Sequence, residues 1–337
     1  MASPDPPLTV AVTGPTGTFG FGLVPLLEAD ERIGRIVGIA RRPFDPAEHG
    51  WRKLEYRRGD VRDPEALAQA FAGADVVVHL AFMITGTAAR HTIREINVDG
   101  TLNAFAAAAA AGARRFVYAS SVAAYGFGRD NPLGMTEDWP ARPAEHLFYA
   151  QEKAQIEQLL QVAAADEPEL GLYVVRPPIV LGPHSVGAKS LLPGPFEPLG
   201  RGLAALALAL PLRVPALVAP LPLQLIHEHD VGEALRLCIL GAGPPGTYNI
   251  AGDGVLTAID VARELGLLPV AVPRAPVQAA AQLLARLPFA PPAVGWAEAM
   301  SSPAIMDAGK AKRELGWSPR YSGLEALRDA LRAQRER

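Results

Sequence analysis

The sequence contains a single cysteine, Cys238, in 337 residues. One cysteine excludes an intrachain disulfide and any metal site built from cysteines. Cys238 lies in the apolar, helix-like run 234–240, where a small buried side chain is the expected role. We also expect no metal site elsewhere, because His227 and His229 flank a predicted helix start without the carboxylate or cysteine companions that a metal needs.

The chain also lacks an excess of charge. Its 32 lysine and arginine residues face 35 aspartate and glutamate residues, which gives a formal net charge of -3. No basic block is interleaved with aromatic residues, so nothing favours binding to nucleic acid or to an anionic membrane surface. Residues 1–7 are rich in proline and lack the basic and apolar regions of a signal peptide. We therefore expect a cytoplasmic protein whose partner is a small-molecule substrate.

Long uninterrupted apolar runs are missing as well, although 49% of the residues are hydrophobic, enough for a sizeable core. The most apolar stretch, 203–226, is broken by Arg213 and four prolines, and its longest uninterrupted piece is far shorter than the roughly 20 residues that span a bilayer. We interpret this stretch as the lid or wall of an apolar pocket, with ordinary packing in a smaller domain as the alternative. Residues 288–292 form a second apolar loop that contains proline.

The first motif is a β-rich run at 8–13 followed by Gly14, Gly17 and Gly20 and then by helix-like residues 21–29. Glycines let the backbone approach a pyrophosphate, which the free N–H groups of a helix N-terminus attract. The spacing G-x-x-G-x-x-G differs from the G-x-G-x-x-G fingerprint, and in isolation it could be a plain turn. Its strand-to-helix context predicts a dinucleotide site.

The second apolar run, 35–40, ends in Arg41 and Arg42, where an NAD-preferring fold usually has an acidic residue. Two guanidinium groups suit a 2′-phosphate, so we favour NADP over NAD, with a solvated basic loop as the alternative. The next strand, 53–61, places Asp60 and Val61 where they could flank the adenine.

Further strand–helix alternation predicts a doubly wound α/β fold with a parallel sheet. The run 74–81 is a continuous apolar strand typical of a sheet buried on both faces, and 116–121 is the next strand. A helix is predicted from Ile93 to about Ala111. Three helix starts are marked by polar residues: Asp63 as an N-cap, and the pairs Asp230 with Glu233 and Thr257 with Asp260 as capping boxes.

A tyrosine and a lysine stand four residues apart at Tyr149 and Lys153, on a predicted helix that follows Ser120 and Ser121. Positions i and i+4 share one face of a helix, so the Lys153 ammonium can reach the Tyr149 phenol. A nearby cation lowers the pKa of a phenol, which lets tyrosine exchange a proton with an alcohol or a carbonyl. The alternative is a solvated lysine beside a half-buried tyrosine.

Together these motifs resemble those of the extended short-chain dehydrogenases/reductases, in the NAD-dependent epimerase/dehydratase family. The resemblance covers nearly the whole chain, and the matching segments are TGPTGTFG (13–20), GDVRD (59–63), HLA (79–81), NVDGT (97–101), SSVAAYG (120–126), YAQEK (149–153), RPPIVLGP (176–183), IHEHDV (226–231), YNIAG (248–252) and ELGWSP (314–319). It implies a Rossmann domain at 1–176 and a mainly substrate-binding domain at 177–337, with about 226–250 returning to the first. It also implies a homodimer through the helices that begin near Ile93 and Phe148.

The resemblance implies roles for individual residues. Tyr149 would be the acid/base, Lys153 would lower its pKa and bind the nicotinamide ribose, and Ser121, with Ser120 as the competing choice, would bind the reacting oxygen. Phe82 stands where many relatives have a small residue, so the resemblance does not define the shape of the pocket near the nicotinamide. Asn97 would support the site from its helix. The implied cofactor-binding residues are Gly14, Thr16, Gly17, Thr18, Phe19, Gly20, Arg41, Arg42, Asp60, Val61, Leu80, Ala81, Phe82, Ala119, Tyr149, Lys153, Pro177 and Ile179.

The segments that face a substrate's diphosphate in nucleotide-sugar relatives are apolar here. Ile179 replaces a common asparagine, and residues 221–225 offer no arginine, although Arg201 or Arg213 could supply charge from another direction. A desolvated diphosphate needs cationic or N–H partners. We therefore expect an NAD(P)-dependent oxidoreductase acting on a ketone or secondary alcohol of a largely apolar molecule. The alternatives are a nucleotide-sugar 4-epimerase or dehydratase with tightly bound NAD, and a non-catalytic NAD(P) sensor.

Overall fold

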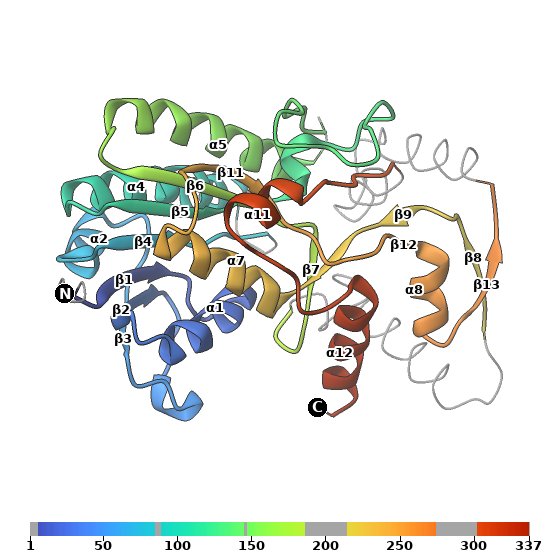
Figure 1. Ribbon diagram of the computed structural model, residues 1–337, viewed down its shortest axis with the longest axis horizontal. Coiled ribbons are helices and arrows are strands. Elements are labelled where there is room, and N and C mark those ends of the chain that lie inside the picture. Colours follow the sequence, from blue (N-terminus) through green and yellow to red (C-terminus); the bar gives the residue numbers. More distant parts are fainter. Residues whose placement is uncertain (1–5, 85–88, 145–146, 186–213, 274–301, 337) are drawn as a thin grey trace.

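The computed structural model describes residues 6–84, 89–144, 147–185, 214–273 and 302–336. Its centre is a seven-stranded parallel sheet with the strand order β11-β6-β5-β4-β1-β2-β3 (Figure 1). From β1 the chain moves outward first to one edge and then to the other. This reversal is the doubly wound topology that the sequence predicts.

The strands of this sheet are rich in valine, isoleucine and alanine because helices cover both of its faces. All four residues of β4 are buried, and the inner residues of β1 are fully buried. The strands are β1 Leu8–Thr13, β2 Ile33–Ala40, β3 Leu54–Arg58, β4 Val76–His79, β5 Arg115–Ala119, β6 Gly171–Arg176 and β11 Gly246–Asn249.

Helices α1 (Thr18–Ala29) and α7 (Glu228–Leu240) cover one face of the sheet, and α2 (Pro64–Phe71), α4 (Gly100–Ala110) and α5 (Phe148–Asp166) cover the other (Figure 1). The core is accordingly split in two. Val10 and Val12 belong to the half on the α1 and α7 side, whereas Ala11 between them belongs to the other half. This alternation is the period of two expected along a strand.

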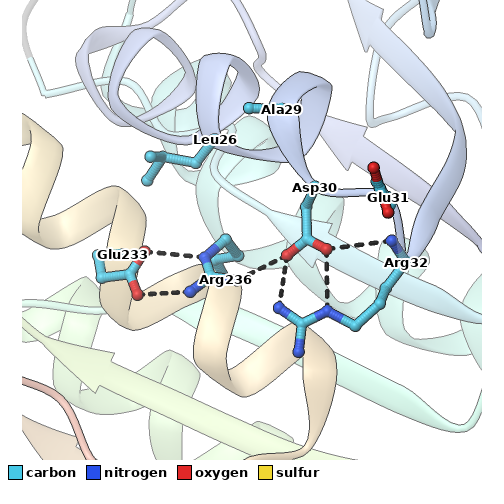
Figure 2. A pocket seen from close by; sticks show the side chains of 7 residues that line it. All are labelled: Leu26, Ala29, Asp30, Glu31, Arg32, Glu233 and Arg236. Carbon is cyan, nitrogen blue, oxygen red and sulfur yellow. Dashed lines mark hydrogen bonds and ion pairs between the residues drawn. The ribbon is translucent and has the colours of Figure 1, made fainter.

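Helices α1 and α7 touch backbone to backbone. A Cβ atom added at Gly232 would lie 2.1 Å from the carbonyl oxygen of Gly22, so neither position has room for a side chain. Beside this contact, Arg236 of α7 binds Glu233 and reaches Asp30, which also binds Arg32 (Figure 2). These groups line a shallow hollow at the C-terminal end of α1, and their mutual pairing gives the hollow a structural role.

The remaining elements form two-stranded sheets and short helices. The short helices η1 (Pro46–His49) and η3 (Val122–Tyr125) belong to the connections around the large sheet. The strand pairs are β7 Ile179–Leu181 with β10 Leu225–His227, β8 Pro215–Val218 with β13 Leu268–Ala271, and β9 Pro222–Leu223 with β12 Leu256–Thr257. The later helices are α8 Ala258–Glu264, α11 Gly309–Glu314 and α12 Gly323–Arg335.

Strand β11 and helix α7 pack with the Rossmann sheet, and both lie in the segment that we expected to return to it. The division into two domains with a boundary near residue 176 stays a prediction. Among the described helices, none combines the length and apolar character needed to cross a membrane. Residues 203–213 of the expected lid or wall lie outside the described residues, as do the loop at 288–292, Arg201 and Arg213, whereas residues 214–226 contain β8, β9 and the first part of β10.

Two helix predictions need correction. The helix expected from Ile93 to Ala111 is three pieces: α3 (Arg90–Arg94), a π-helical turn η2 (Glu95–Asp99) and α4. The capping box of Asp230 with Glu233 is wrong, because α7 begins three residues earlier than expected and His227 is its N-cap. Asp230 instead accepts the backbone N–H groups of two residues in the loop before α12.

Other local predictions are confirmed. Asp63 caps α2 by accepting the N–H groups of the first turn, and Thr257 and Asp260 form a capping box on α8. Cys238 is fully buried, and burial raises the pKa of its thiol, so the group is inert packing.

Candidate active site

The glycine-rich turn between β1 and α1 has the geometry of a phosphate cradle. Gly14 has a φ of +70°, and a Cβ atom there would come within 3.0 Å of the Ala81 backbone. Gly20 lies against the Pro15 carbonyl, whereas Gly17 is open, with only the Gly14 oxygen 3.5 Å from where its Cβ would be. Gly17 caps α1 without a side-chain hydrogen bond, so the N–H groups of Thr18 and Phe19 have no capping side chain. The turn therefore fits the pyrophosphate of a dinucleotide.

A buried histidine fixes the segment after β4 beside this turn. His79 is fully buried, and burial together with the charge of Lys153 lowers its pKa to about 3, so its ring is neutral. The Thr101 hydroxyl donates to the Asn97 carbonyl and therefore accepts from His79 Nε2 at 3.0 Å. His79 Nδ1 then accepts from the Thr13 hydroxyl at 2.9 Å.

Thr13 completes this chain of hydrogen bonds. Its hydroxyl oxygen accepts the backbone N–H groups of Leu80 and Ala81, both at 3.2 Å. The two predicted cofactor-binding residues are thus held next to Gly14. In the sequence, His79 is recognisable only as part of a motif. The apolar run around it carries no signal for its hydrogen-bonding role, because a single polar residue in a buried strand looks like an exception.

The predicted adenosine-binding residues meet at the ends of β2 and β3. Arg41 and Arg42 follow β2 and are exposed, and their guanidinium groups form no ion pair with a residue in the described ranges. Asp60 is bound by Arg62 through two hydrogen bonds, and this pairing lowers the pKa of its carboxyl. Val61 is buried. The charge of Arg41 contributes to this lowering of the Asp60 pKa, and both guanidinium groups stay exposed at the ends of the two strands.

Ser121 faces Tyr149, and Ser120 does not. Ser121 caps η3, shortly after β5, and its side chain lies close enough to that of Tyr149, in the first turn of α5, to oppose the rise in the tyrosine's pKa. Ser120 instead donates to the buried carboxylate of Glu157. Of the two serines, only Ser121 is placed to share an oxygen with Tyr149.

Lys153 is buried, with 3% of its surface exposed, and its ammonium points toward β5. It donates to the Ala119 carbonyl at 2.7 Å and to the Tyr118 hydroxyl at 3.1 Å. Burial lowers the pKa of Lys153 to about 7, against the opposing charges of Glu157 and Glu152. Burial also raises the pKa of Tyr149, opposed by its bond to Ser121. The lowered tyrosine pKa that we expected is therefore not seen, because the lysine contacts Tyr118 and Ala119.

Two buried carboxylates, those of Glu152 and Glu157, support the site through hydrogen bonds to neighbouring side chains. Asn97 donates to Glu152 at 2.7 Å and exchanges two hydrogen bonds with the backbone of Met83, as expected for a supporting residue. Glu157 binds Arg176 at the end of β6 through two of its nitrogens. Neither glutamate was predicted from the sequence, because a glutamate on a helix usually lies on a solvated face.

The last two predicted residues follow β6. Pro177 is buried, and its carbonyl accepts the Val122 N–H at 2.9 Å, so it lies directly beside the segment of Ser121. Ile179 begins β7, and 39% of its surface is exposed. In the described part of the chain, no group of three or more histidine, cysteine, aspartate or glutamate residues is placed to hold a metal ion.

Comparisons with known proteins agree with this geometry. A sequence model of the family described as "NAD dependent epimerase/dehydratase family" matches residues 10–197. An uncharacterized protein of Mycobacterium tuberculosis is 29% identical over 348 residues, covering 98% of this chain and 85% of that protein. The ceramide reductase of Caulobacter vibrioides is 31% identical over 326 residues, covering 92% and 86%.

Among solved structures, the chain is similar to the UDP-glucose 4-epimerase of Thermus thermophilus in complex with NAD. The TM-score is 0.70 at 23% identity, and the match covers 97% of this chain and 99% of that one. At this identity the similarity shows the shared fold alone.

Proposed function

The chain belongs to the NAD dependent epimerase/dehydratase family, and from this premise we propose that it is an oxidoreductase that interconverts a ketone and a secondary alcohol on an apolar substrate. The observation that carries the proposal is the meeting of Ser121, Tyr149 and Lys153 at the end of β5, beside the phosphate turn. In an open α/β sheet this end of the strands is where ligands bind.

The proposed reaction gives each side chain one task. In the reducing direction, the hydroxyl groups of Ser121 and Tyr149 donate hydrogen bonds to the substrate's carbonyl oxygen and stabilise the negative charge that develops there. When bound, the nicotinamide supplies the hydride that adds to the carbonyl carbon. Tyr149 passes its proton to the oxygen, which completes the alcohol, and it regains a proton from the side of Lys153 or from water.

Two observations support an apolar substrate. Ile179 presents an aliphatic surface where nucleotide-sugar relatives commonly have asparagine. The buried amide of Gln224 binds both the N–H and the carbonyl of Met306, so it is directed at the backbone of this chain and not at a substrate. The similarity to a ceramide reductase points in the same direction. We propose long-chain keto lipids, and their alcohols, as the substrate class.

NADP is the proposed cofactor. Arg41 and Arg42 lie at the end of β2 with no ion-pair partner among the described residues, and a guanidinium group binds phosphate through charge-assisted hydrogen bonds. At this place an NAD-preferring fold usually has an acidic residue that binds the ribose hydroxyls, and this chain has Arg41 and Arg42 instead.

The test is a set of turnover measurements with NADPH and NADH on keto lipids of increasing chain length, including long-chain keto amides of the ceramide type. We expect turnover with NADPH that improves with chain length. A protein that instead retains nicotinamide through chromatography and binds UDP, dTDP or GDP in calorimetry would be an epimerase or dehydratase. Cofactor binding without turnover of any substrate would leave the sensor as the better hypothesis.

A further inference from the structure

One aromatic ring contacts both members of the tyrosine–lysine pair. Phe82 meets the ring of Tyr149 edge to face, with centroids 5.4 Å apart and an interplanar angle of 86°. The Lys153 ammonium lies 3.9 Å from the centre of the same ring. Both distances are within the range of favourable aromatic and cation–π contacts.

The backbone on either side of Phe82 is fixed. Before it, the N–H groups of Leu80 and Ala81 donate to Thr13. After it, Met83 exchanges two hydrogen bonds with the buried side chain of Asn97, at 2.7 and 3.0 Å. The hydrogen bonds of the backbone on either side of Phe82 therefore hold its ring against Tyr149 and Lys153, in addition to side-chain packing.

Phe82 also supplies the third contact of the ammonium. An ammonium group has three N–H donors, and two of them are used by Ala119 and Tyr118. The third side is covered by the face of Phe82, which is only partly buried, whereas Lys153 beneath it is buried. The ring thus lies over the ammonium on its more open side.

We propose that Phe82 is the positioning residue of the Tyr149–Lys153 pair, and that its ring keeps water from the ammonium and thereby sets the pH range in which the pair exchanges protons. The effect of Phe82 on catalysis rests on the proposed function, but the shielding of the Lys153 ammonium by the Phe82 ring does not depend on any substrate. A small residue at position 82, as in many relatives, would leave the ammonium open on this side.

The direction of the effect follows from the surroundings of Lys153. Burial is the largest cause that lowers its pKa to about 7, and removing the ring admits water and raises the pKa toward its ordinary value. Loss of the cation–π contact acts in the opposite direction but is the smaller effect. The other ionisable groups that face Lys153 stay unchanged in a Phe82 variant; they are Glu152, Glu157, Tyr118, Tyr149 and His79.

The experiment measures the titration of Lys153 without any substrate. The rate at which an amine reagent labels Lys153 is followed against pH by mass spectrometry, with the partly exposed Lys312 as internal reference. We expect a midpoint near the pKa of about 7 in the wild type. In Phe82→Ala we expect faster labelling and a midpoint higher by about one pH unit or more. Phe82→Leu, which keeps an apolar cover, should stay near the wild type.

The matched control is Phe148→Ala. Phe148 is the neighbour of Tyr149 in sequence, but its ring lies under the Arg90 guanidinium and is not part of the Tyr149–Lys153 pair. An equal midpoint in Phe82→Ala and the wild type would overturn the proposal, as would an equal shift in the control or a Lys153 that stays unlabelled in both proteins. The pH profile of turnover should move with the labelling midpoint. Because labelling needs no substrate, an enzyme without detectable turnover would refute the proposed function and leave the result on Phe82 intact.

Discussion

Burial acts on the two central side chains in opposite senses, raising the pKa of the Tyr149 phenol and lowering that of the Lys153 ammonium. Both shifts favour the neutral forms. The raised pKa of Tyr149 keeps the proton on the phenol, so that it is available to a substrate oxygen that develops negative charge. Ser121 opposes the rise in the pKa of Tyr149, which is the effect of a hydroxyl that donates toward the phenol oxygen.

Tyr149→Phe should therefore lose turnover by about 100-fold or more, because the proton donor is removed while the ring that fills the site remains. The affinity for NADPH should change little, since the phosphate turn and Lys153 are untouched. Turnover and a fluorescence titration of NADPH measure the two effects. Tyr173→Phe is the control, because the Tyr173 hydroxyl donates to the Gly243 carbonyl and lies near Arg115, on another part of the sheet. Retained turnover in Tyr149→Phe would contradict the assigned role.

His79 gives a prediction about stability and pH. Its pKa is about 3 in the folded protein and close to 6.5 when unfolded. The unfolded chain therefore takes up a proton first, so the stability that neutral His79 contributes is complete above pH 6.5 and is lost as the pH falls toward 3. Between these values we expect the free energy of unfolding to fall by about 1.4 kcal/mol per pH unit from this group.

Urea unfolding of the wild type and of His79→Gln at pH 8, 6 and 5 measures this loss. His79→Gln should be less stable at pH 8 but show a shallower decline below pH 6.5, because its amide does not titrate. Parallel declines in the two proteins would mean that other groups dominate the acid response.

At the scale of elements, sequence patterns predicted the bounds of every strand of the large sheet up to Ser121 to within a few residues. This is because strands of a parallel sheet buried on both faces consist of unbroken apolar runs. They missed the π-helical turn at Glu95–Asp99. That turn brings Asn97 toward Met83 and Glu152, partners 14 and 55 residues away in sequence, and local periodicity carries no signal for such partners. The mistaken capping box has the same origin, since Asp230 serves a loop 90 residues later.

The crossing of α1 and α7 gives a prediction at this scale. Gly232→Ala would place a methyl group 2.1 Å from the Gly22 carbonyl, so the helices must move apart. We expect a loss of about 1–3 kcal/mol in the free energy of unfolding, as for other overpacked sites. Denaturant unfolding measures it. Gly323→Ala in the first turn of α12 is the control, because its nearest neighbour would be 3.5 Å away, and it should be neutral or slightly stabilising.

For the whole molecule, the sequence predicted the Rossmann topology, whereas the roles of individual site residues came from the resemblance to a family and stay predictions. The sequence could not predict the contacts that join segments far apart along the chain. His184 shows this: its imidazole and its N–H bind Glu228, its ring stacks on Phe21, and its carbonyl accepts from Thr18. The loop after β7 is thereby fastened to the start of α1, next to the phosphate turn.

The proposed preference for NADP rests on the two arginines at the end of β2, and it can be tested with the whole protein. Arg41→Ala combined with Arg42→Ala should weaken NADPH binding and leave NADH binding nearly unchanged, because only the former carries the 2′-phosphate. A hydrogen bond to a charged group contributes about 1.5–3 kcal/mol, so losing one such bond weakens binding about tenfold or more.

Dissociation constants for NADPH and NADH from fluorescence titration measure this preference. Arg328→Ala, on α12 and bound to Glu264, is the control for removal of an arginine elsewhere. Equal losses for NADPH and NADH in the double variant would show that the two arginines support the fold of this edge and not the 2′-phosphate. A wild type that prefers NADH would refute the NADP assignment directly, and the exposed guanidinium groups after β2 would then be a solvated basic loop.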